Sequence, residues 1–395
     1  MKKLFALVVP VFIAGIAMSQ SAVSIANGNW TNPLTWNCTC VPLPGYSVTV
    51  NHSVTLNTSF TFTSAGITIN SGGSVAQDNG TRDILINGGS VTNNGYLNVR
   101  FILAQAGAWA NSGTITARSI DNYINFTNVG VIKSVDSMRN NAVMINNGKM
   151  LNVDSIMHAG TFTNNGQCTH HFITNTGTLT NNNYLSFTDI TNIGTFTNTD
   201  SIIGSRSMFN KGRWTNTSGA LVSLNKSLLN KNLPVASACI INNGKFKILD
   251  SYYNFDTIRG VTGSFEVQDS SVNYGHMNQS FDFCDLTCTV TPVKVDFNFG
   301  TVSPSITYCL NMGVDESTTA KNDVILYPNP ANEAIYVKGF GQEDYELTVI
   351  NSNGDLIFRD SNLSKIDMTP YSEGLYLITI TSKNSKLTRK IQLIK

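Results

Sequence analysis

The sequence predicts an all-β chain: a parallel β-solenoid of about 18 residues per coil, right-handed by preference, followed by a small Ig-like β-sandwich. Corner glycines return at a nearly constant interval, since Gly95, Gly113, Gly130 and Gly148 are 18, 17 and 18 residues apart. Charged residues make up only 13% of the chain, and Asn, Thr, Ser and Gly replace them, which favours short strands and tight turns. Residues 324–395 carry more charge and cleaner strand alternation, so they predict a separate domain.

Residues 1–19 have the composition of a signal peptide. Lys2 and Lys3 precede an apolar stretch from Leu4 to Ala17, which is short for a membrane span. Small residues at Ala17 and Ser19 predict cleavage before Gln20. No later segment is apolar and long enough to cross a bilayer as a helix, so we expect no transmembrane segment after cleavage.

Residues 20–60 are predicted to cap the first coil of the solenoid. Trp30 and Trp36 lie six residues apart, before a Pro/Gly turn and the alternating strands that begin near Val48. This arrangement resembles the G-x-W-x(5)-T-W…P…V-x-I pattern that opens many secreted bacterial β-helix proteins. We expect the two indoles to cover the open end of the core. The alternative is a platform on which sugars stack.

Residues 61–280 are predicted to form ten to twelve coils. The residue two after each corner glycine is apolar: Leu97, Ile115, Ile132, Met150, Cys168, Leu179, Phe196, Trp214, Leu221, Phe246 and Phe265. The residue four before it is also apolar, as in Val91, Trp109 and Phe126. Two steps of 11 (Gly166 to Gly177) and 7 (Gly212 to Gly219) add up to 18 and are taken to restore the phase. We expect the glycines to supply positive φ, and the asparagines to form hydrogen-bonded ladders.

An acidic column is the one candidate metal site in the repeats. Asp136, Asp154, Asp200, Asp250 and Asp269 each lie six residues after a corner glycine. Asp136 and Asp154 belong to consecutive coils, so they are weak candidates for a calcium site. The favoured interpretation is a second corner at which Asp caps a turn. The adjacent residues His170 and His171 should point to opposite faces of a strand, which disfavours a shared metal.

Residues 281–310 are predicted to close the solenoid, and residues 311–323 to form a polar linker. The chain has seven cysteines, an odd number, and an exported protein can form disulfides. The candidates for disulfides are Cys38, Cys40, Cys284, Cys288 and Cys309. The spacing does not decide which of them pair.

Residues 324–395 contain a set of motifs that spans the whole domain. The motifs are Tyr327-Pro328-Asn329-Pro330, an Asn-x-x-Gly hairpin ending at Gly354, a Gly374-Leu375-Tyr376 strand and a basic-apolar terminus. Together they resemble the type A C-terminal sorting domain of the type IX secretion system of Bacteroidetes. The resemblance implies a small β-sandwich recognised by the outer-membrane translocon. It also implies release of the cargo or its attachment to surface lipopolysaccharide, and so a secreted or cell-surface location.

Composition and motifs narrow the function classes. The net charge of +1 and the lack of a basic face argue against nucleic-acid binding. No nucleophile, zinc-protease or phosphate-loop motif occurs, so neither an enzyme nor a cofactor is expected, calcium being the weak exception. The first hypothesis is an adhesin-type structural rod that contacts glycans, other cells or matrix. The alternative is a polysaccharide-binding or polysaccharide-degrading β-helix with its site on one face. Ice binding through Thr-x-Thr pairs is a distant third.

Overall fold

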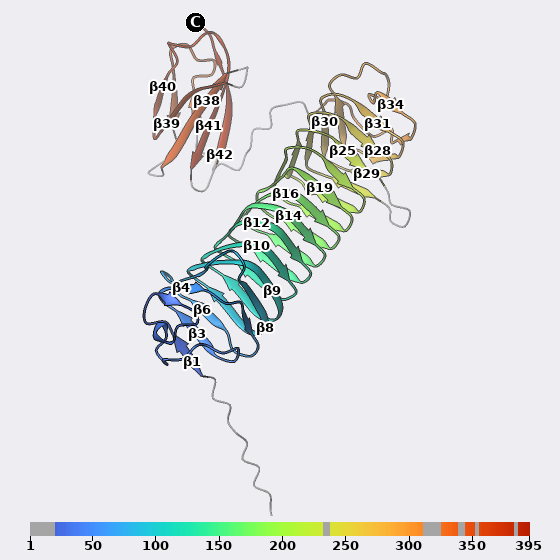
Figure 1. The fold of residues 1–395 in the computed structure, drawn as a ribbon. Coiled ribbons are helices and arrows are strands. Elements are labelled where there is room, and N and C mark those ends of the chain that lie inside the picture. Colours follow the sequence, from blue (N-terminus) through green and yellow to red (C-terminus); the bar gives the residue numbers. More distant parts are fainter. Residues whose placement is uncertain (1–19, 232–237, 311–324, 339–343, 352–354, 383–385) are drawn as a thin grey trace, which may run out of the picture. The chain divides into compact units, whose positions relative to one another are not determined.

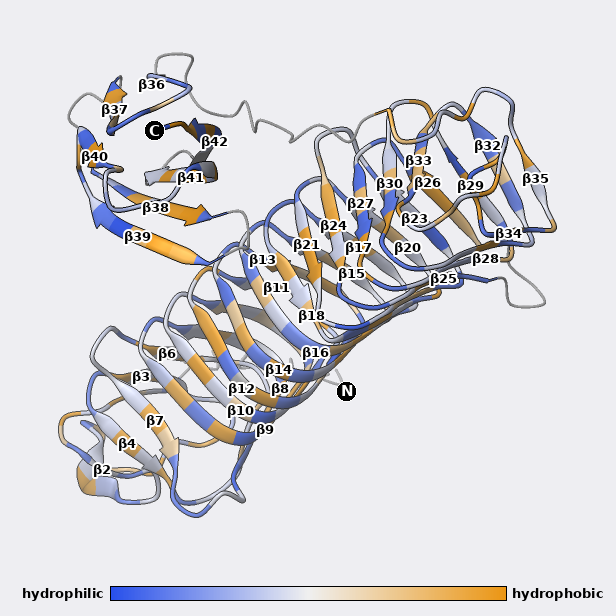
Figure 2. Cartoon of the chain, turned by 90° about the horizontal axis from the view of Figure 1, so that it is seen from above, coloured by the Kyte–Doolittle hydropathy of each residue, from blue (hydrophilic) through white to orange (hydrophobic). Residues whose placement is uncertain are grey.

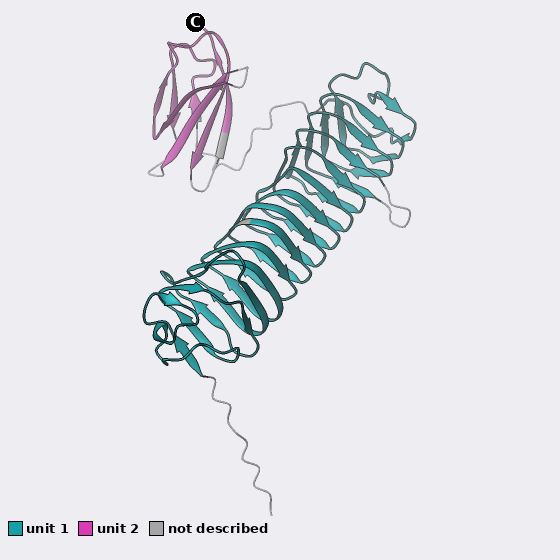
Figure 3. Ribbon diagram, in the orientation of Figure 1, with its two compact units in different colours: residues 1–311 teal, residues 312–395 magenta. Residues whose placement is uncertain are grey.

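The computed structural model describes residues 20–231, 238–310, 325–338, 344–351, 355–382 and 386–395. Two compact units divide the chain, residues 1–311 and 312–395, and each is described by itself (Figure 3). The predicted signal peptide 1–19, the predicted linker 311–323 and Gly354 lie outside the described residues.

The first unit is a parallel β-solenoid of about 13 coils, slightly more than the ten to twelve predicted (Figure 1). Its 35 strands form one continuous sheet that winds around the core, with about 18 residues per coil. A 3-10 turn, η1 (Pro33–Thr35), is the helical element of the described residues, and none of their helices could span a membrane. The predicted fold class is confirmed.

Each complete coil contributes strands to three faces, named A, B and C in chain order, and the longest strands run along more than one face. Face A contains β2 (Gly28–Asn29), β4 (Ser53–Leu56), β7 (Ser74–Gln77), β9 (Tyr96–Asn111), β10 (Thr114–Asn122), β12 (Val131–Asn140), β14 (Lys149–His158), β16 (Gln167–Asn175), β18 (Leu185–Phe187), β21 (Ser201–Gly204), β24 (Leu221–Leu224), β27 (Lys245–Ile248), β30 (Ser264–Val267) and β33 (Asp282–Asp285).

Face B contains β5 (Phe60–Phe62), β8 (Asp83–Asn93), the second halves of β9, β10, β12, β14 and β16, then β19 (Asp189–Asn192), β22 (Met208–Asn210), β25 (Leu228–Asn230), β28 (Tyr252–Asn254), β31 (Ser271–Asn273) and β34 (Phe297–Asn298). Face C contains β1 (Ser21–Val23), β3 (Ser47–Val50), β6 (Ile67–Ile69), the ends of β8 and β9, β11 (Phe126–Asn128), β13 (Val143–Asn146), β15 (Thr161–Asn164), β17 (Thr178–Asn181), β20 (Thr195–Asn198), β23 (Arg213–Asn216), β26 (Cys239–Asn242), β29 (Thr257–Gly260), β32 (His276–Gln279) and β35 (Thr301–Val302).

Alternation along each short strand builds the core. In β15, Phe162 and Asn164 are fully buried whereas Thr161 and Thr163 face outward. Figure 2 shows the same exchange of apolar and polar residues along many strands. Equivalent residues of successive coils then stack, as in the parallel rings of Phe196 and Trp214, whose centroids lie 3.8 Å apart. Burial of each large apolar side chain contributes about 1.5–3 kcal/mol.

The corner glycines occupy two corners of the coil rather than one. Up to Gly166 they precede face A, where Gly148 packs on Gly130 of the previous coil. Gly177 instead packs on Gly160 and precedes face C. The step of 11 residues, from Gly166 to Gly177, therefore marks a change from one corner to another. The step of 7, from Gly212 to Gly219, marks the return to the first corner. The expectation that all these glycines occupy one corner of the coil is wrong.

The residue two after Gly219 does not lie in the core, although the sequence pattern predicts that it does. This glycine adds a residue to the corner, with φ of 79°. Leu221 is therefore partly exposed, and Val222 and Leu224 enter the core in its place.

Close backbone packing, rather than positive φ, explains glycine at the stacked corners. Of the corner glycines used to set the period, Gly219 alone has positive φ. A Cβ on Gly148 would lie 2.1 Å from the carbonyl oxygen of Gly130, and a Cβ on Gly113 would lie 2.0 Å from that of Gly95. Carbonyls of one coil thus occupy the space that a side chain on the next coil would need.

Two ladders of asparagines, buried except for Asn298 at the last coil, run along the solenoid, as the sequence predicts. The ladder at the end of face C has Nδ2···Oδ1 distances of 2.6–2.9 Å and runs through Asn93, Asn111, Asn128, Asn146, Asn164, Asn181, Asn198, Asn216 and Asn242. The ladder at the end of face B has distances of 2.8 Å and comprises Asn122, Asn140, Asn175, Asn192, Asn210, Asn230, Asn254, Asn273 and Asn298. The amides also bond corner carbonyls, so most of them are satisfied in the interior.

Parallel stacking extends beyond the predicted limits of residues 61–280. It begins with β1 against β3 and ends with β32 against β35, because the terminal segments supply strands as well as covers. Trp30 and Trp36 are buried at the first end, with ring centroids 5.2 Å apart, and the Trp36 Nε1 donates to the Trp30 carbonyl at 2.9 Å. They pack as lids, as expected, and do not expose a platform for sugars.

The structure resolves the pairing that the cysteine spacing leaves open. Cys38 bonds to Cys40, and Cys284 bonds to Cys309 across the closing coil. Cys288, Cys168 and Cys239 remain as thiols. The second disulfide ties the last described segment of this unit to β33.

The second unit consists of two antiparallel sheets around one core. One sheet has the order β36 (Ile325–Tyr327), β37 (Ala334–Lys338), β40 (Lys365–Asp367). The other has the order β39 (Leu356–Ser361), β38 (Tyr345–Asn351), β41 (Gly374–Ser382), β42 (Lys386–Leu393). Ile335, Leu347 and Ile378 meet in the shared core, as a small sandwich requires.

Candidate functional sites

A row of mostly ionisable residues follows the corner between faces A and B. Main-chain hydrogen bonds and strand register place one residue of the row on each coil, for example Arg100 on Arg82 and Lys226 on Arg206. The row consists of Arg82, Arg100, Arg118, Asp136, Asp154, His171, Thr188, Arg206, Lys226, Asp250 and Asp269. The predicted acidic column therefore mixes two corners. Asp200 belongs to the corner before face A, where its carbonyl accepts from Asn198 Nδ2 at 2.8 Å.

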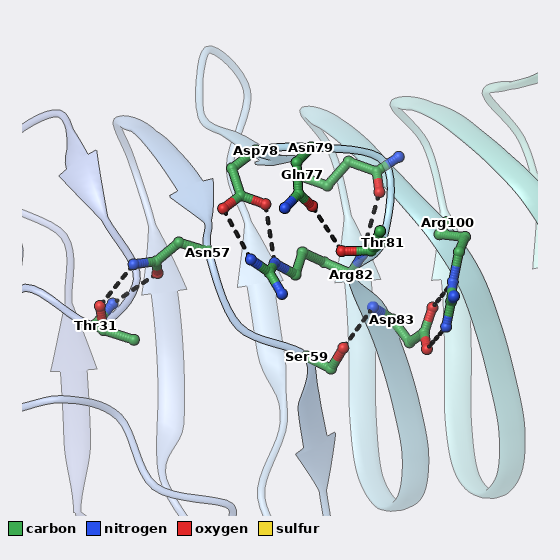
Figure 4. Close-up of polar contacts among 10 residues, drawn as sticks. All are labelled: Thr31, Asn57, Ser59, Gln77, Asp78, Asn79, Thr81, Arg82, Asp83 and Arg100. Atoms are coloured by element: carbon green, nitrogen blue, oxygen red, sulfur yellow. Dashed lines mark hydrogen bonds and ion pairs between the residues drawn. The ribbon is translucent and has the colours of Figure 1, made fainter.

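Ion pairs fix the first arginines of this row (Figure 4). Arg82 binds both carboxylate oxygens of Asp78 at 2.9 and 3.0 Å, and this contact lowers the pKa of Asp78. Arg100 pairs in the same forked manner with Asp83, whose amide donates to Ser59 Oγ at 3.0 Å. These guanidinium groups thus bind local carboxylates.

Asp136 and Asp154 lie on adjacent coils, as the calcium hypothesis requires. Each, however, has a basic partner on its other side: Arg118 Nε lies 3.4 Å from Asp136, and His171 Nδ1 contacts Asp154. Both carboxylates are more than half exposed. Two solvated acids with basic neighbours form a weak cation site, since calcium takes six to eight oxygen ligands. A shallow hollow of about 430 Å³ lies beside them, lined by Arg100, Phe101, Arg118, Ser119, Asp136 and Ser137.

Among the described residues, three potential metal ligands converge elsewhere, at Asp285, Cys288 and Asp296 in the closing coil. The Asp285 carboxylate already accepts hydrogen bonds from Ser271 Oγ at 2.5 Å, Thr287 N at 2.9 Å and Cys288 N at 3.1 Å. These bonds explain the buried carboxylate as part of a turn.

The glycine corner before face A forms a shallow groove of about 400 Å³. Its lining consists of Val129, Gly130, Val131, Asn147, Gly148, Lys149, Asn165, Gly166, Gln167 and Asn183. An outward amide row runs along this corner, with Asn165 donating to Asn147 and Asn182 donating to Asn165, each at 2.8 Å. Thr199 Oγ1 extends the row to Asn182 at 3.0 Å. The outward amides thus repeat on successive coils.

A histidine replaces asparagine in the ladder of face B. His158 stacks in register between Asn140 and Asn175, and its ring lies parallel to Phe162 at a centroid distance of 4.3 Å. Within the described part of the chain, neither ring nitrogen of His158 has a hydrogen-bond partner, and Asn175 Oδ1 has none either. Burial, with a smaller effect of His170, lowers the pKa of His158 to about 3.

His170 repeats this situation one coil further on. It is buried without a described hydrogen-bond partner, and burial, together with His171, lowers its pKa to about 3. His171 is exposed, so the predicted opposite orientation of the two side chains is confirmed. The sequence reveals the adjacent pair, but His158 gives no local signal because its role depends on the ladder.

In the second unit, Asn329 joins the start of the domain to its last strand. Its Nδ2 donates to the Lys390 carbonyl, and its Oδ1 accepts from the Gln392 amide, both at 2.9 Å. Pro328 and Pro330 flank it with cis peptide bonds, and Tyr327 packs on Tyr336 at 5.7 Å between ring centroids. The motif thus completes the edge of β42.

The second motif of this domain lies at the start of β41. Gly374 has φ of 152°, which disfavours other residues there. Tyr376 is buried, and its hydroxyl donates to the Ser372 carbonyl at 2.6 Å. A hollow of about 740 Å³ elsewhere in the domain is lined by Pro328, Asn332, Glu333, Ala334, Tyr336, Lys365, Asp367 and Thr369.

Replacing Asn329 by alanine is expected to destabilise the second unit by about 1–3 kcal/mol, because two main-chain groups of β42 lose their partner. Urea unfolding of this unit measures the loss. Asn332→Ala is the matched control, since Asn332 is exposed, and its effect should stay within about 0.5 kcal/mol. Equal midpoints for the two variants would contradict the bridging role of Asn329.

The chain is thus an all-β protein in which a parallel solenoid is followed by a second compact unit with its own core. Residues 325–395 match the family model of the secretion system C-terminal sorting domain, and this part of the chain is a type IX sorting domain. The protein is therefore secreted or displayed at the cell surface.

Comparison with whole proteins adds little. No curated protein matches the chain. One solved structure that matches is the chitinase ChiW from Paenibacillus sp. str. FPU-7, described as a cell-surface-expressed multi-modular enzyme. The two are 10% identical, with 88% of this chain and 24% of that chain covered and a TM-score of 0.15. The chain thus spans about a quarter of that enzyme's length, and at this TM-score the likeness carries no weight.

Proposed function

We propose that this protein is a structural adhesin that presents its rigid polar solenoid to glycans, other cells or matrix outside the cell. Its export is established by the sorting domain. The asparagine ladders and continuous core support rigidity, because each coil is bonded to its neighbours along the whole rod. We further propose that it acts by binding rather than by catalysis.

The glycine-corner groove is the observation that carries this proposal. Its amides at Asn147 and Asn165, and that of Asn182 next along the same row, repeat at the strand spacing of about 4.8 Å along the rod. A polysaccharide chain lying along the groove would offer hydroxyl groups at regular intervals to these amides, because the groove follows the corner from coil to coil. Binding of this kind depends on many weak polar contacts rather than on charge.

A glycan array with the wild-type chain from residue 20 onward tests the proposal, and Asn165→Ala removes the centre of the amide row. We expect the apparent Kd of the bound glycans to rise about tenfold, equivalent to about 1.4 kcal/mol. Thr191→Ala, an outward residue of face B, is the control and should leave the affinity unchanged. Polysaccharide turnover that is lost on Asp154→Ala would contradict the adhesin proposal and favour the enzyme alternative.

A further inference from the structure

The outward side of face B changes character toward the C-terminal end of the solenoid. On the middle coils its central position carries Arg139, Met157, Thr174 and Thr191. On the next five coils the same position is apolar, in strict register: Phe209, Leu229, Tyr253, Val272 and Phe297. These residues belong to β22, β25, β28, β31 and β34. Figure 1 labels the last four of these strands at this end of the solenoid, and Figure 2 labels β25, β28 and β34.

A second apolar row lies beside the first, at the corner that follows face B. Phe255, Tyr274 and Phe299 each come directly after a ladder asparagine and stack in parallel, with centroid distances of 5.1 and 4.8 Å. Lys231 covers the near end of this row, 5.3 Å from the Phe255 centroid. The two rows together are called the aromatic stripe: Phe209, Leu229, Tyr253, Val272, Phe297, Phe255, Tyr274 and Phe299.

The aromatic stripe is large enough to support an interface. The exposed fractions of its five most exposed rings run from 36% for Phe209 to 65% for Phe299. With about 150–250 Å² for each full ring, these rings expose roughly 500 Å². That is near the top of the range for the largest apolar patch on a monomer. Two copies of the stripe in contact would bury about 1,000 Å², the size at which specific protein interfaces begin.

The chemistry of the stripe favours a protein surface over a sugar. Rings stacked on one another, as at Tyr274, present mainly their edges to solvent, whereas a sugar platform needs exposed ring faces. The eight residues of the stripe carry no charge that would select an ionic partner. Residues 311–323, which follow the solenoid, are mostly polar in sequence and offer few apolar side chains to cover it.

We propose that the aromatic stripe is an isologous interface through which two copies of this chain pair side by side along face B. A two-fold axis makes the same patch meet itself, and an uncharged apolar patch meets its own copy without charge repulsion. The pairing leaves the glycine-corner groove outside the contact, because that groove lies at the corner between faces C and A. The proposal does not depend on the groove binding glycans.

Sedimentation equilibrium of the chain from residue 20 onward tests the pairing. We expect the wild type to reach the mass of a dimer with a micromolar Kd, given the size of the interface. Replacing Phe297 and Phe299 together by lysine should raise that Kd at least tenfold, since both side chains are exposed and the contact would have to bury two charged groups of each copy against apolar rings. Thermal unfolding of the double variant checks that the solenoid still folds.

The matched control places the same two charges elsewhere. Val143→Lys with Ile203→Lys alters exposed apolar residues of faces C and A, away from the stripe and outside the groove lining, and should leave the dimer intact. A wild type that stays monomeric overturns the proposal, as does a dimer that persists in the Phe297/Phe299 variant. The dimer proposal is also overturned if the wild type is a monomer that sediments with insoluble polysaccharide and the Phe297/Phe299 variant does not. That result would show that the stripe binds a glycan.

Discussion

Gly148→Ala is expected to destabilise the solenoid by about 3 kcal/mol, a large effect for one methyl group. The added Cβ would lie 2.1 Å from the Gly130 carbonyl oxygen and 2.4 Å from that of Val129. Both atoms belong to backbone, so neither can rotate away as a side chain would. The coils must separate locally, which strains the strand hydrogen bonds on both sides of the corner.

The midpoint of urea unfolding measures this loss, and Gly72→Ala is the informative control. Gly72 has φ of 86° and nothing within 4 Å of the Cβ position, so its substitution costs about 1–2 kcal/mol through conformation alone. If close packing is the reason for glycine at the stacked corners, Gly148→Ala is the more damaging change. The opposite order would contradict close backbone packing as the reason for glycine at Gly148.

His158→Asn is expected to stabilise the solenoid by about 2 kcal/mol at pH 7, although most core substitutions destabilise. Asparagine at this position would accept from Asn140 and donate to Asn175, whose Oδ1 is now unpaired among the described residues. Two buried ring nitrogens without partners disappear at the same time. Loss of the stacking contact with Phe162 offsets part of the gain.

The pH dependence gives this prediction a second, independent measure. The pKa of His158 is lowered to about 3 by burial, so the unfolded chain binds the proton more tightly than the folded one. The free energy of unfolding of the wild type should therefore fall as the pH drops from about 6.5 toward 3. His158 and His170 should each contribute about 1.4 kcal/mol per pH unit, and His158→Asn should halve this slope.

His171→Asn is the control for the midpoint, because the His171 side chain is exposed and its replacement removes no buried ring nitrogen from the core. An unchanged slope in His158→Asn would contradict the assignment of a neutral, buried His158.

The repeat made much of the fold predictable from the sequence. Alternation around the corners identified core residues such as Phe162 and Trp214, and the asparagines indicated the ladders. The period of 18 fixes the length of a coil, but it does not distinguish its three corners. A glycine that moves from one corner to another, as between Gly166 and Gly177, therefore looks like an irregular spacing. The same ambiguity placed Asp200 in a column with Asp136.

The surfaces were harder to predict than the core, because they depend on which outward residues meet across coils. Phe209 and Phe297 are 88 residues apart in sequence, yet they belong to one row. The ion pairs of Asp136 and Asp154 likewise come from neighbouring coils. The sorting motif, by contrast, is local and was evident from its residues, and Asn329 shows why one of them is needed.

The direction of the ladders has a mechanical consequence. Strand hydrogen bonds and asparagine amides both run along the rod, so a pull on its ends loads them in tension, coil after coil in series. Release of one coil of about 18 residues frees roughly 60 Å of chain, which would let a tethered rod lengthen in steps under load. At the C-terminal end, the Cys284–Cys309 bond passes the force directly to β33. The chain between these two cysteines therefore carries no load.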